Sequence, residues 1–183
     1  TGGNILSADD PSAGGASVGV NPSRAHGDVS VDGAANVSGQ ILGAGNVLIS
    51  GQSLSAQTLV AGIDFDATNV ANGNIVLGQS GVLTVSVNGA VTAPTIQAAG
   101  AIDISGATIT ADAITGHKDV TLSGATTIDR QILGGGDVNI SGPSIKAGTI
   151  VSGVDFLGTA AANGNIVQTT SGDVSLTSSG NIT

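Results

Sequence analysis

Four aspartates recur at one constant interval in the second half of the chain, and their spacing suggests chemistry. They are Asp119, Asp137, Asp155 and Asp173. If this interval, about 18 residues, makes one circuit of a stacked fold, the four carboxylates form a column with about 4.8 Å between neighbours. Such a column offers the oxygen ligands that Ca²⁺ takes, and a bound cation would relieve the repulsion between like charges.

A structural role explains the same spacing without a metal. Aspartate and asparagine favour the corner before a strand, because their side chains hydrogen-bond to backbone groups there. The aligned positions Asp28, Asn46 and Asp64 mix charge with amide, while Val82 and Ala101 interrupt the series. We therefore predict no metal site and no cofactor, and we keep the four-aspartate column as a Ca²⁺ alternative.

Histidine is the other residue type that could do chemistry. His26 and His117 hold equivalent places in two long repeats, which would set them five turns apart, so they cannot share a site. The chain has no cysteine and no glutamate. Neither a zinc site nor a nucleophilic triad can be assembled from what remains, and we predict no catalytic residues.

Enzymes that act on polysaccharides are the main competing class, because they also occur on stacked β-folds. They need a groove with clustered carboxylates and a basic or aromatic residue that holds the sugar. Here the four basic residues are scattered along the chain and aromatic residues make up 1% of it. We expect no enzymatic activity. The basic residues are Arg24, Lys118, Arg130 and Lys146.

Threonine-rich stretches raise a third possibility, an ice-binding face. Thr108 and Thr110 would lie side by side on one face of a strand. Steps of the same constant interval place Ile128 and Lys146 after Thr110. No flat threonine array is therefore expected.

The composition narrows the fold and the partners. Of the 183 residues, 30 are glycine and 40% are hydrophobic, and these are valine, isoleucine, leucine and alanine with two phenylalanines. β-Branched residues favour strands, and glycine is costly inside helices. The net charge of −9 disfavours nucleic acid and anionic membranes. No apolar run is long enough to span a bilayer.

Internal similarity is the strongest signal in the sequence. Residues 26–92 align without a gap on residues 117–183, an offset of 91. Within this unit, a residue that precedes a strand recurs in steps of 18, 36, 19, 18 and 18 from Gly27 to Gly136, and we take the step of 36 as two turns. The unit then holds five turns, and the chain about ten, in a rod near 50 Å long.

Strands of alternating pattern follow these positions. Val29 and Val31, Val47 and Ile49, Val120 and Leu122, and Val138 and Ile140 fall on one face of their strands. Two shorter strand-like segments follow some of them, so each turn has three sides. We predict an all-β fold, a right-handed parallel β-helix built as a three-sided solenoid with turns of about 18 residues. Residues 1–26 keep the period poorly and are expected to form an irregular first turn or a boundary region, followed by the β-helix over residues 27–183.

The residue pattern of the repeat resembles that of a known family. Gly-Asp-Val-x-Ile-Ser-Gly from Gly136 is followed by Ser-Ile-x-Ala-Gly, by Val-x-Gly-Val-Asp and later by Gly-Asn-Ile. This pattern is similar to the haemagglutinin repeats of the filamentous haemagglutinin family, the large exoproteins of two-partner secretion systems. The family includes adhesins and contact-dependent growth inhibition toxins, and the resemblance implies a long β-helical rod on a cell surface.

The resemblance sets the functional expectation. We expect a structural stalk or adhesive segment of a secreted exoprotein on the surface of a Gram-negative bacterium, which mediates attachment or cell–cell contact. The alternative is a receptor- or glycan-binding region of a growth-inhibition or adhesin protein. Expected partners are a host or neighbouring-cell receptor or glycan and an outer-membrane secretion partner, with no membrane insertion. The chain starts at Thr1 without a signal sequence, so targeting information is expected elsewhere in a longer parent protein.

Overall fold

The computed structural model describes residues 5–6, 27–64, 76–78, 80–156, 166–168 and 171–183, and these form strands and connections without a helix. None of the described segments is a helix that could cross a membrane. The strands are β1 (Ile5–Leu6), β2 (Val29–Asp32), β3 (Ala35–Asn36), β4 (Gln40–Gly43), β5 (Val47–Gly51), β6 (Leu54–Ser55), β7 (Thr58–Ala61), β8 (Leu83–Val87), β9 (Ala90–Thr92), β10 (Thr95–Ala98), β11 (Ile102–Gly116), β12 (Val120–Gly134), β13 (Val138–Gly142), β14 (Ile145–Val151) and β15 (Val174–Ser178).

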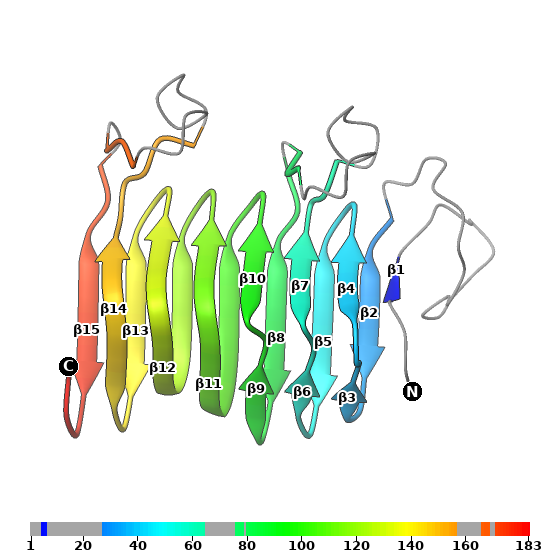
Figure 1. The fold of residues 1–183 in the computed structure, drawn as a ribbon, viewed down its shortest axis with the longest axis horizontal. Helices are drawn as coiled ribbons and strands as arrows, with labels where there is room; N and C mark the ends of the chain where they lie inside the picture. Colours follow the sequence, from blue (N-terminus) through cyan, green and yellow to red (C-terminus); the bar gives the residue numbers. More distant parts are fainter. Residues whose placement is uncertain (1–4, 7–26, 65–75, 79, 157–165, 169–170) are drawn as a thin grey trace.

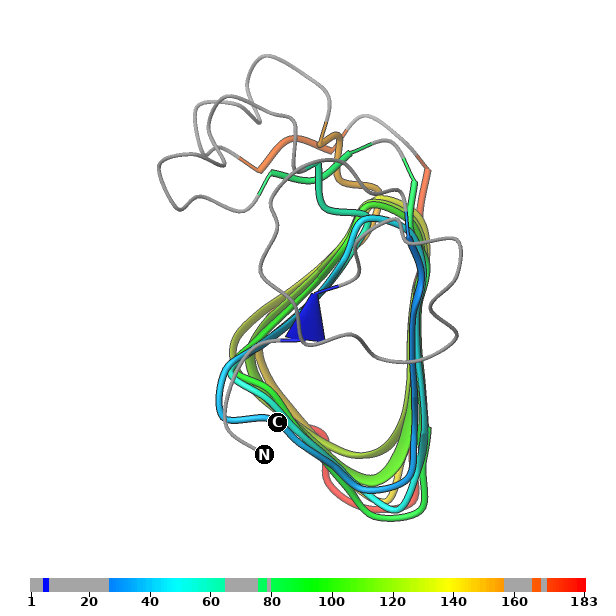
Figure 2. The same cartoon turned by 90° about the vertical axis from the view of Figure 1, so that its right-hand side faces the viewer.

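The strands stack into a three-sided rod in which every pairing between named strands is parallel (Figure 1). Seen down the rod from the end that holds β2, the chain runs clockwise as it recedes, so the solenoid is right-handed (Figure 2). We call one circuit a coil. The predicted right-handed parallel β-helix is confirmed.

Each side of the rod is a column of strands from successive coils. The first face contains β2, β5, β8, residues 102–105 of β11, residues 120–123 of β12, β13 and β15. The second face contains β3, β6, β9 and the middle segments of β11 and β12, followed by the start of β14. The third face contains β4, β7, β10 and the last parts of β11, β12 and β14.

The number of coils corrects the sequence interpretation. Val47 pairs directly with Leu83, so the longest step in the series is one coil with an insertion and not two coils. The repeat unit therefore makes four coils. Seven strands on the first face are separated by six steps, which gives a rod about 29 Å long instead of about 50 Å. Glycine spacing cannot separate two short circuits from one long circuit, because both return the chain to the same corner.

The core consists of aliphatic side chains that point inward from all three faces. One continuous cluster runs from Val29 in β2 to Ile145 in β14. Val47, Val120 and Val138 have no exposed surface, which confirms the inward assignment made from the alternating pattern. Each such side chain contributes about 1.5–3 kcal/mol by leaving water. The rod therefore coheres without disulfides or aromatic residues.

The two insertions leave the rod at the same corner, after β7 and after β14 (Figure 1). We call their described parts the first branch base (residues 62–64 and 76–78) and the second branch base (residues 152–156 and 166–168). An antiparallel bridge closes each, Ile63 to Leu77 and Val154 to Gln168. Gly62 and Gly153 have φ angles of 75° and 66°, a conformation that costs other residues about 1–2 kcal/mol.

Two residues near the start of the chain pair with the rod. β1 pairs in parallel with β4, Ile5 with Ile41 and Leu6 with Leu42. The rest of the region expected as an irregular first turn, residues 1–4 and 7–26, lies outside the described residues.

Candidate functional site

The first face presents an unbroken outward column of hydroxyl groups. The register stacks one hydroxyl residue per coil over six coils, and Ser50 Oγ donates a hydrogen bond of 3.0 Å to Asp32 Oδ1 at the start of the column. We call this set the hydroxyl column. Its members are Ser50, Ser86, Ser105, Ser123, Ser141 and Thr177.

The hydroxyl column can hydrogen-bond to a partner because its groups face outward along the sheet. A hydroxyl both donates and accepts, and five of the six residues are exposed, with Ser50 half-buried. The column therefore offers a straight row of donors and acceptors on a rigid sheet.

A second outward column runs parallel to the first on the same face. It lies two residues earlier in each strand, about 6.5–7 Å away along the strand direction. Its members carry hydroxyl, carboxylate or amide groups, except for one leucine. This second column therefore has one negative charge and does not repeat a single chemical group. They are Ser30, Leu48, Thr84, Asp103, Thr121, Asn139 and Ser175.

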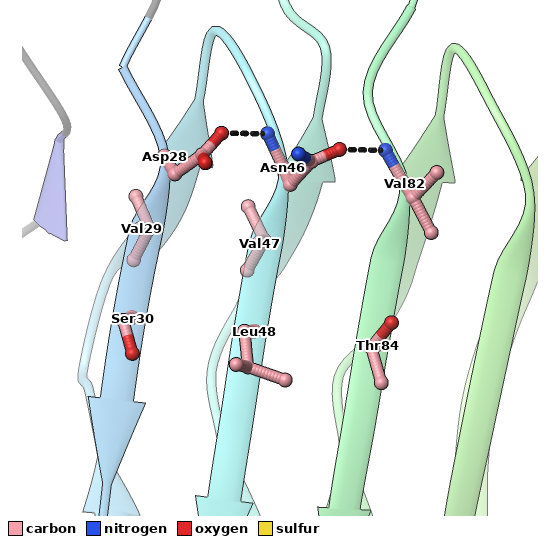
Figure 3. A pocket seen from close by; sticks show the side chains of 8 residues that line it. All are labelled: Asp28, Val29, Ser30, Asn46, Val47, Leu48, Val82 and Thr84. Carbon is pink, nitrogen blue, oxygen red and sulfur yellow. Dashed lines mark hydrogen bonds between the residues drawn. The ribbon is translucent and has the colours of Figure 1, made fainter.

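Along the corner before this face, carboxylate and amide side chains join successive coils. Asp28 Oδ1 accepts a hydrogen bond of 2.6 Å from the backbone N–H of Asn46. Asn46 Oδ1 in turn accepts one of 2.9 Å from the N–H of Val82 (Figure 3). Each side chain thus binds the residue stacked on it, one coil further on.

The same ladder recurs in the second long repeat, and it contains three of the four aspartates of the predicted column. Asp119 Oδ1 accepts from the N–H of Asp137, and Asp137 Oδ1 accepts from the N–H of Asp173, both at 2.9 Å. Asp155 is not in the column, because the coil that would hold it is the long one. Its N–H donates to the carbonyl oxygen of Val167 in the second branch base, at 2.7 Å.

The ladder supports the structural interpretation of these aspartates. Asp119 and Asp137 each use a carboxylate oxygen to hold the next coil. Within the described parts of the chain, no three carboxylate, histidine or cysteine residues gather closely enough to hold a metal. Ca²⁺ binding by Asp119, Asp137 and Asp173 stays an untested alternative.

The glycines that precede Asn46 and Asp137 have a specific cause. A Cβ at Gly45 would collide with the carboxylate of Asp28, and a Cβ at Gly136 would collide with that of Asp119. At these two positions glycine therefore leaves the space through which the carboxylate of the preceding coil reaches the next backbone N–H.

An open hollow lies beside the first ladder. Asp28, Asn46 and Thr84 contribute polar groups to its lining (Figure 3). Leu48 and Val82 expose 48% and 41% of their surfaces there. In the second repeat the residue equivalent to Val82 is Asp173, so this apolar spot belongs to the first repeat alone.

The second face corrects the expectation about threonines. Thr110 pairs with Thr127 and not with Ile128, because β11 and β12 differ by one residue at the corner before this segment. The shift turns Thr126 inward, where it is 1% exposed, and its hydroxyl donates to Gly124 O. The second face therefore has an outward column of hydroxyl residues, which a constant step along the sequence does not reveal. Its members are Ser55, Thr92, Thr110 and Thr127.

The remaining candidate residues do not converge. Lys118 lies at the corner before β12, Arg130 in the bulge within β12, and Lys146 on the second face. His26 and Arg24 lie outside the described residues. The offset between the long repeats, which relates His26 to His117, corresponds to four coils, where five were expected.

Sequence reasoning overlooked the hydroxyl column, although a signal for it was present. Serine followed by glycine recurs at Ser50, Ser105, Ser123 and Ser141, each time after an inward aliphatic residue. Only the register of the coils shows that these serines stack.

Comparison of the chain with protein-family models, curated proteins and solved structures found no match.

Proposed function

We propose that the chain is a rigid, non-enzymatic stalk segment of a larger exported surface protein, which spaces or presents adhesive elements. The single observation that carries this proposal is the unbroken first face, where seven strands stack in register over one continuous aliphatic core. Such a rod can hold other parts of a protein at a fixed distance, and this role requires no active centre. Location on a Gram-negative surface and export by an outer-membrane partner are parts of the proposal that rest on the sequence resemblance.

The spacer role is tested by changing the length of the rod. Insertion of a second copy of residues 27–117 directly after residue 117 keeps the register, because the unit makes four coils. The rod should lengthen by about 19 Å, measured as the maximum dimension in small-angle scattering, with an undiminished melting temperature. In a parent adhesin, attachment should persist. An unchanged dimension or a collapsed β signal in circular dichroism would contradict the proposal.

Direct glycan binding is a second candidate, favoured by the hydroxyl column. Carbohydrates present hydroxyls at regular intervals, and a flat row of donors and acceptors complements them. Asp32 and Asp103 on the same face would repel anionic sugars, so neutral glycans and amino sugars are the favoured class.

The two roles are separated by charge placed on one face at a time. Ser105→Glu with Ser123→Glu should abolish binding to immobilised neutral glycans. The matched control carries Thr92→Glu with Thr110→Glu on the second face and should bind normally. Loss of binding in the first variant alone supports recognition by the hydroxyl column. Equal binding of both variants and the parent chain would contradict that site, and no binding by the parent chain assigns the segment to spacing only.

A further inference from the structure

An aromatic stack ties the second branch base to the rod. The rings of His117 and Phe156 lie 4.5 Å apart between centroids and 15° from parallel. His117 is at the corner between β11 and β12, and Phe156 lies in the first segment of the second branch base, after β14. The two residues are distant in the chain, and the ends of their strands are two coils apart.

The branch base runs beside the corner of the coil that lies between it and His117. Gly153 N–H donates to Gly136 O at 3.1 Å and Val154 N–H to Gly134 O at 2.9 Å. Gly135 lies on the corner of His117, and any side chain at Gly135 would collide with the His117 backbone. The branch base is therefore hydrogen-bonded to the intervening coil, while Phe156 stacks on His117 of the coil before it.

Hydrogen bonds hold the two chains of the branch base together. Asp155 N–H donates to Val167 O at 2.7 Å, and Gln168 Nε2 donates to Ser152 O at 2.8 Å. Ser152 Oγ donates to Gly172 O at 2.8 Å. These bonds are uncharged, so the stack is the part of this attachment that contains a group titrating near neutral pH.

Burial and one neighbouring cation oppose protonation of the imidazole. Burial lowers the pKa of His117, and the neighbouring Lys118 lowers it further. The other charged residues on the elements that meet here are Asp119, Asp137 and Asp155, while residues 98–101 of the preceding coil carry none. Two of these carboxylates, Asp119 and Asp137, already accept backbone hydrogen bonds. The imidazole is therefore neutral at pH 7 and stacks as an apolar ring.

We propose that His117 and Phe156 form an acid-sensitive clasp that helps to fix the second branch base to the rod at neutral pH and holds it less strongly in acid. The direction follows from linkage. A histidine whose pKa is lower in the clasped state than its released value of about 6.5 stabilises the clasp fully above that value. This stabilisation falls as the pH drops from 6.5 to the clasped pKa and is constant below it.

The first repeat carries the same pair at the same spacing. His26 and Phe65 have the same separation in the chain as His117 and Phe156, and the offset of the long repeat relates the two pairs. Both His26 and Phe65 lie outside the described part of the chain. The duplication shows that the histidine, the phenylalanine and the insertion that contains the phenylalanine recur together in the sequence.

The clasp is tested by amide hydrogen exchange and by ring contacts in NMR. The protection of the Val154 amide, which donates to Gly134 O in the rod, should be constant above pH 7 after correction for intrinsic exchange. It should fall by up to tenfold per pH unit below 6.5 until the clasped pKa is reached. The nuclear Overhauser effect between the two rings should fade over the same range, and two histidines and two phenylalanines in the whole chain keep the assignment simple. The amide of Val138, which donates to Asp173 O in the rod, should keep its protection.

Variants separate the clasp from general acid sensitivity. His117→Gln should make the protection of the Val154 amide independent of pH, and Phe156→Leu should lower it already at neutral pH. His26→Gln is the matched control and should behave as the parent chain. Retained pH dependence in His117→Gln would overturn the proposal, as would full Val154 protection in the parent chain down to pH 4.5. Loss of Val138 protection in parallel with that of Val154 would also overturn it, because the whole rod would then be opening.

Discussion

The ladder at Asp137 gives the sharpest quantitative test of how successive coils are joined. The N–H of Asp137 donates to Asp119 Oδ1 in the preceding coil, and Asp137 Oδ1 accepts from the N–H of Asp173 in the next coil, both at 2.9 Å. Asp137→Ala removes the second bond and leaves the N–H of Asp173 without this acceptor. A bond to a charged group contributes about 1.5–3 kcal/mol when shielded, and this corner is exposed. We therefore expect a loss of about 1 kcal/mol.

Asp137→Asn separates the hydrogen bond from the charge. Asn46 performs the same task in the first repeat by accepting from Val82 N–H, so an amide at position 137 should keep the bond. It also removes repulsion from two carboxylates stacked about 4.8 Å away, each worth about 0.9 kcal/mol in water before salt screening. The loss of charge assistance offsets this gain. Asp137→Asn should lie within about 0.5 kcal/mol of the parent chain.

Urea unfolding followed by far-ultraviolet circular dichroism measures these differences, and amide exchange at Asp173 localises them. Gly136→Ala should resemble Asp137→Ala in sign, because its Cβ displaces the carboxylate of Asp119. Asp129→Ala is the matched control, since it removes an exposed charge from β12 that lies away from the ladder corner. Equal stability of Asp137→Ala and Asp137→Asn would refute the role assigned to the ladder.

Three further predictions address the core, the branch and the metal alternative. Val138→Asp should unfold several coils, because it places a charge at a position without exposed surface at a cost above about 4 kcal/mol; Asn139→Asp, on the outward side of the same strand, should melt near the parent temperature. Gly153→Ala should lower stability by about 1 kcal/mol in urea unfolding, because its φ of 66° disfavours a side chain, and an unchanged midpoint would contradict that cause. Calorimetric titration with Ca²⁺ should give no heat and no rise in melting temperature; a rise that Asp137→Asn abolishes would instead support the aspartate column.

Much of the fold could be predicted from local patterns. Alternation in segments such as Val138 to Ile140 identified the inward face, because successive side chains of a strand point to opposite sides. The near-constant interval between strands indicated stacked coils and parallel pairing, because a hairpin sheet needs no such interval. The absence of cysteine and the scarcity of aromatic residues pointed to an aliphatic core.

The candidate site was less accessible to the same reasoning. One residue fewer at the corner before Thr126 turns that threonine inward and places Thr127 beside Thr110, since a shift of one position exchanges the faces of a strand. The hydroxyl column likewise depends on steps of unequal length that bring Ser50, Ser86 and Ser105 into line. A fixed period does not align them.

The sequence by itself determined the solenoid, its three-sided coil and its aliphatic interior, because side-chain alternation and repeat length are local properties of the chain. Only the tertiary structure decided how many coils the chain makes, that Asp155 leaves the aspartate column, and that Phe156 returns to His117. These depend on whether a segment circles the rod or departs from it. Both paths begin and end at the same corner, so they leave the same spacing in the sequence, and hydrogen bonds between coils select one of them.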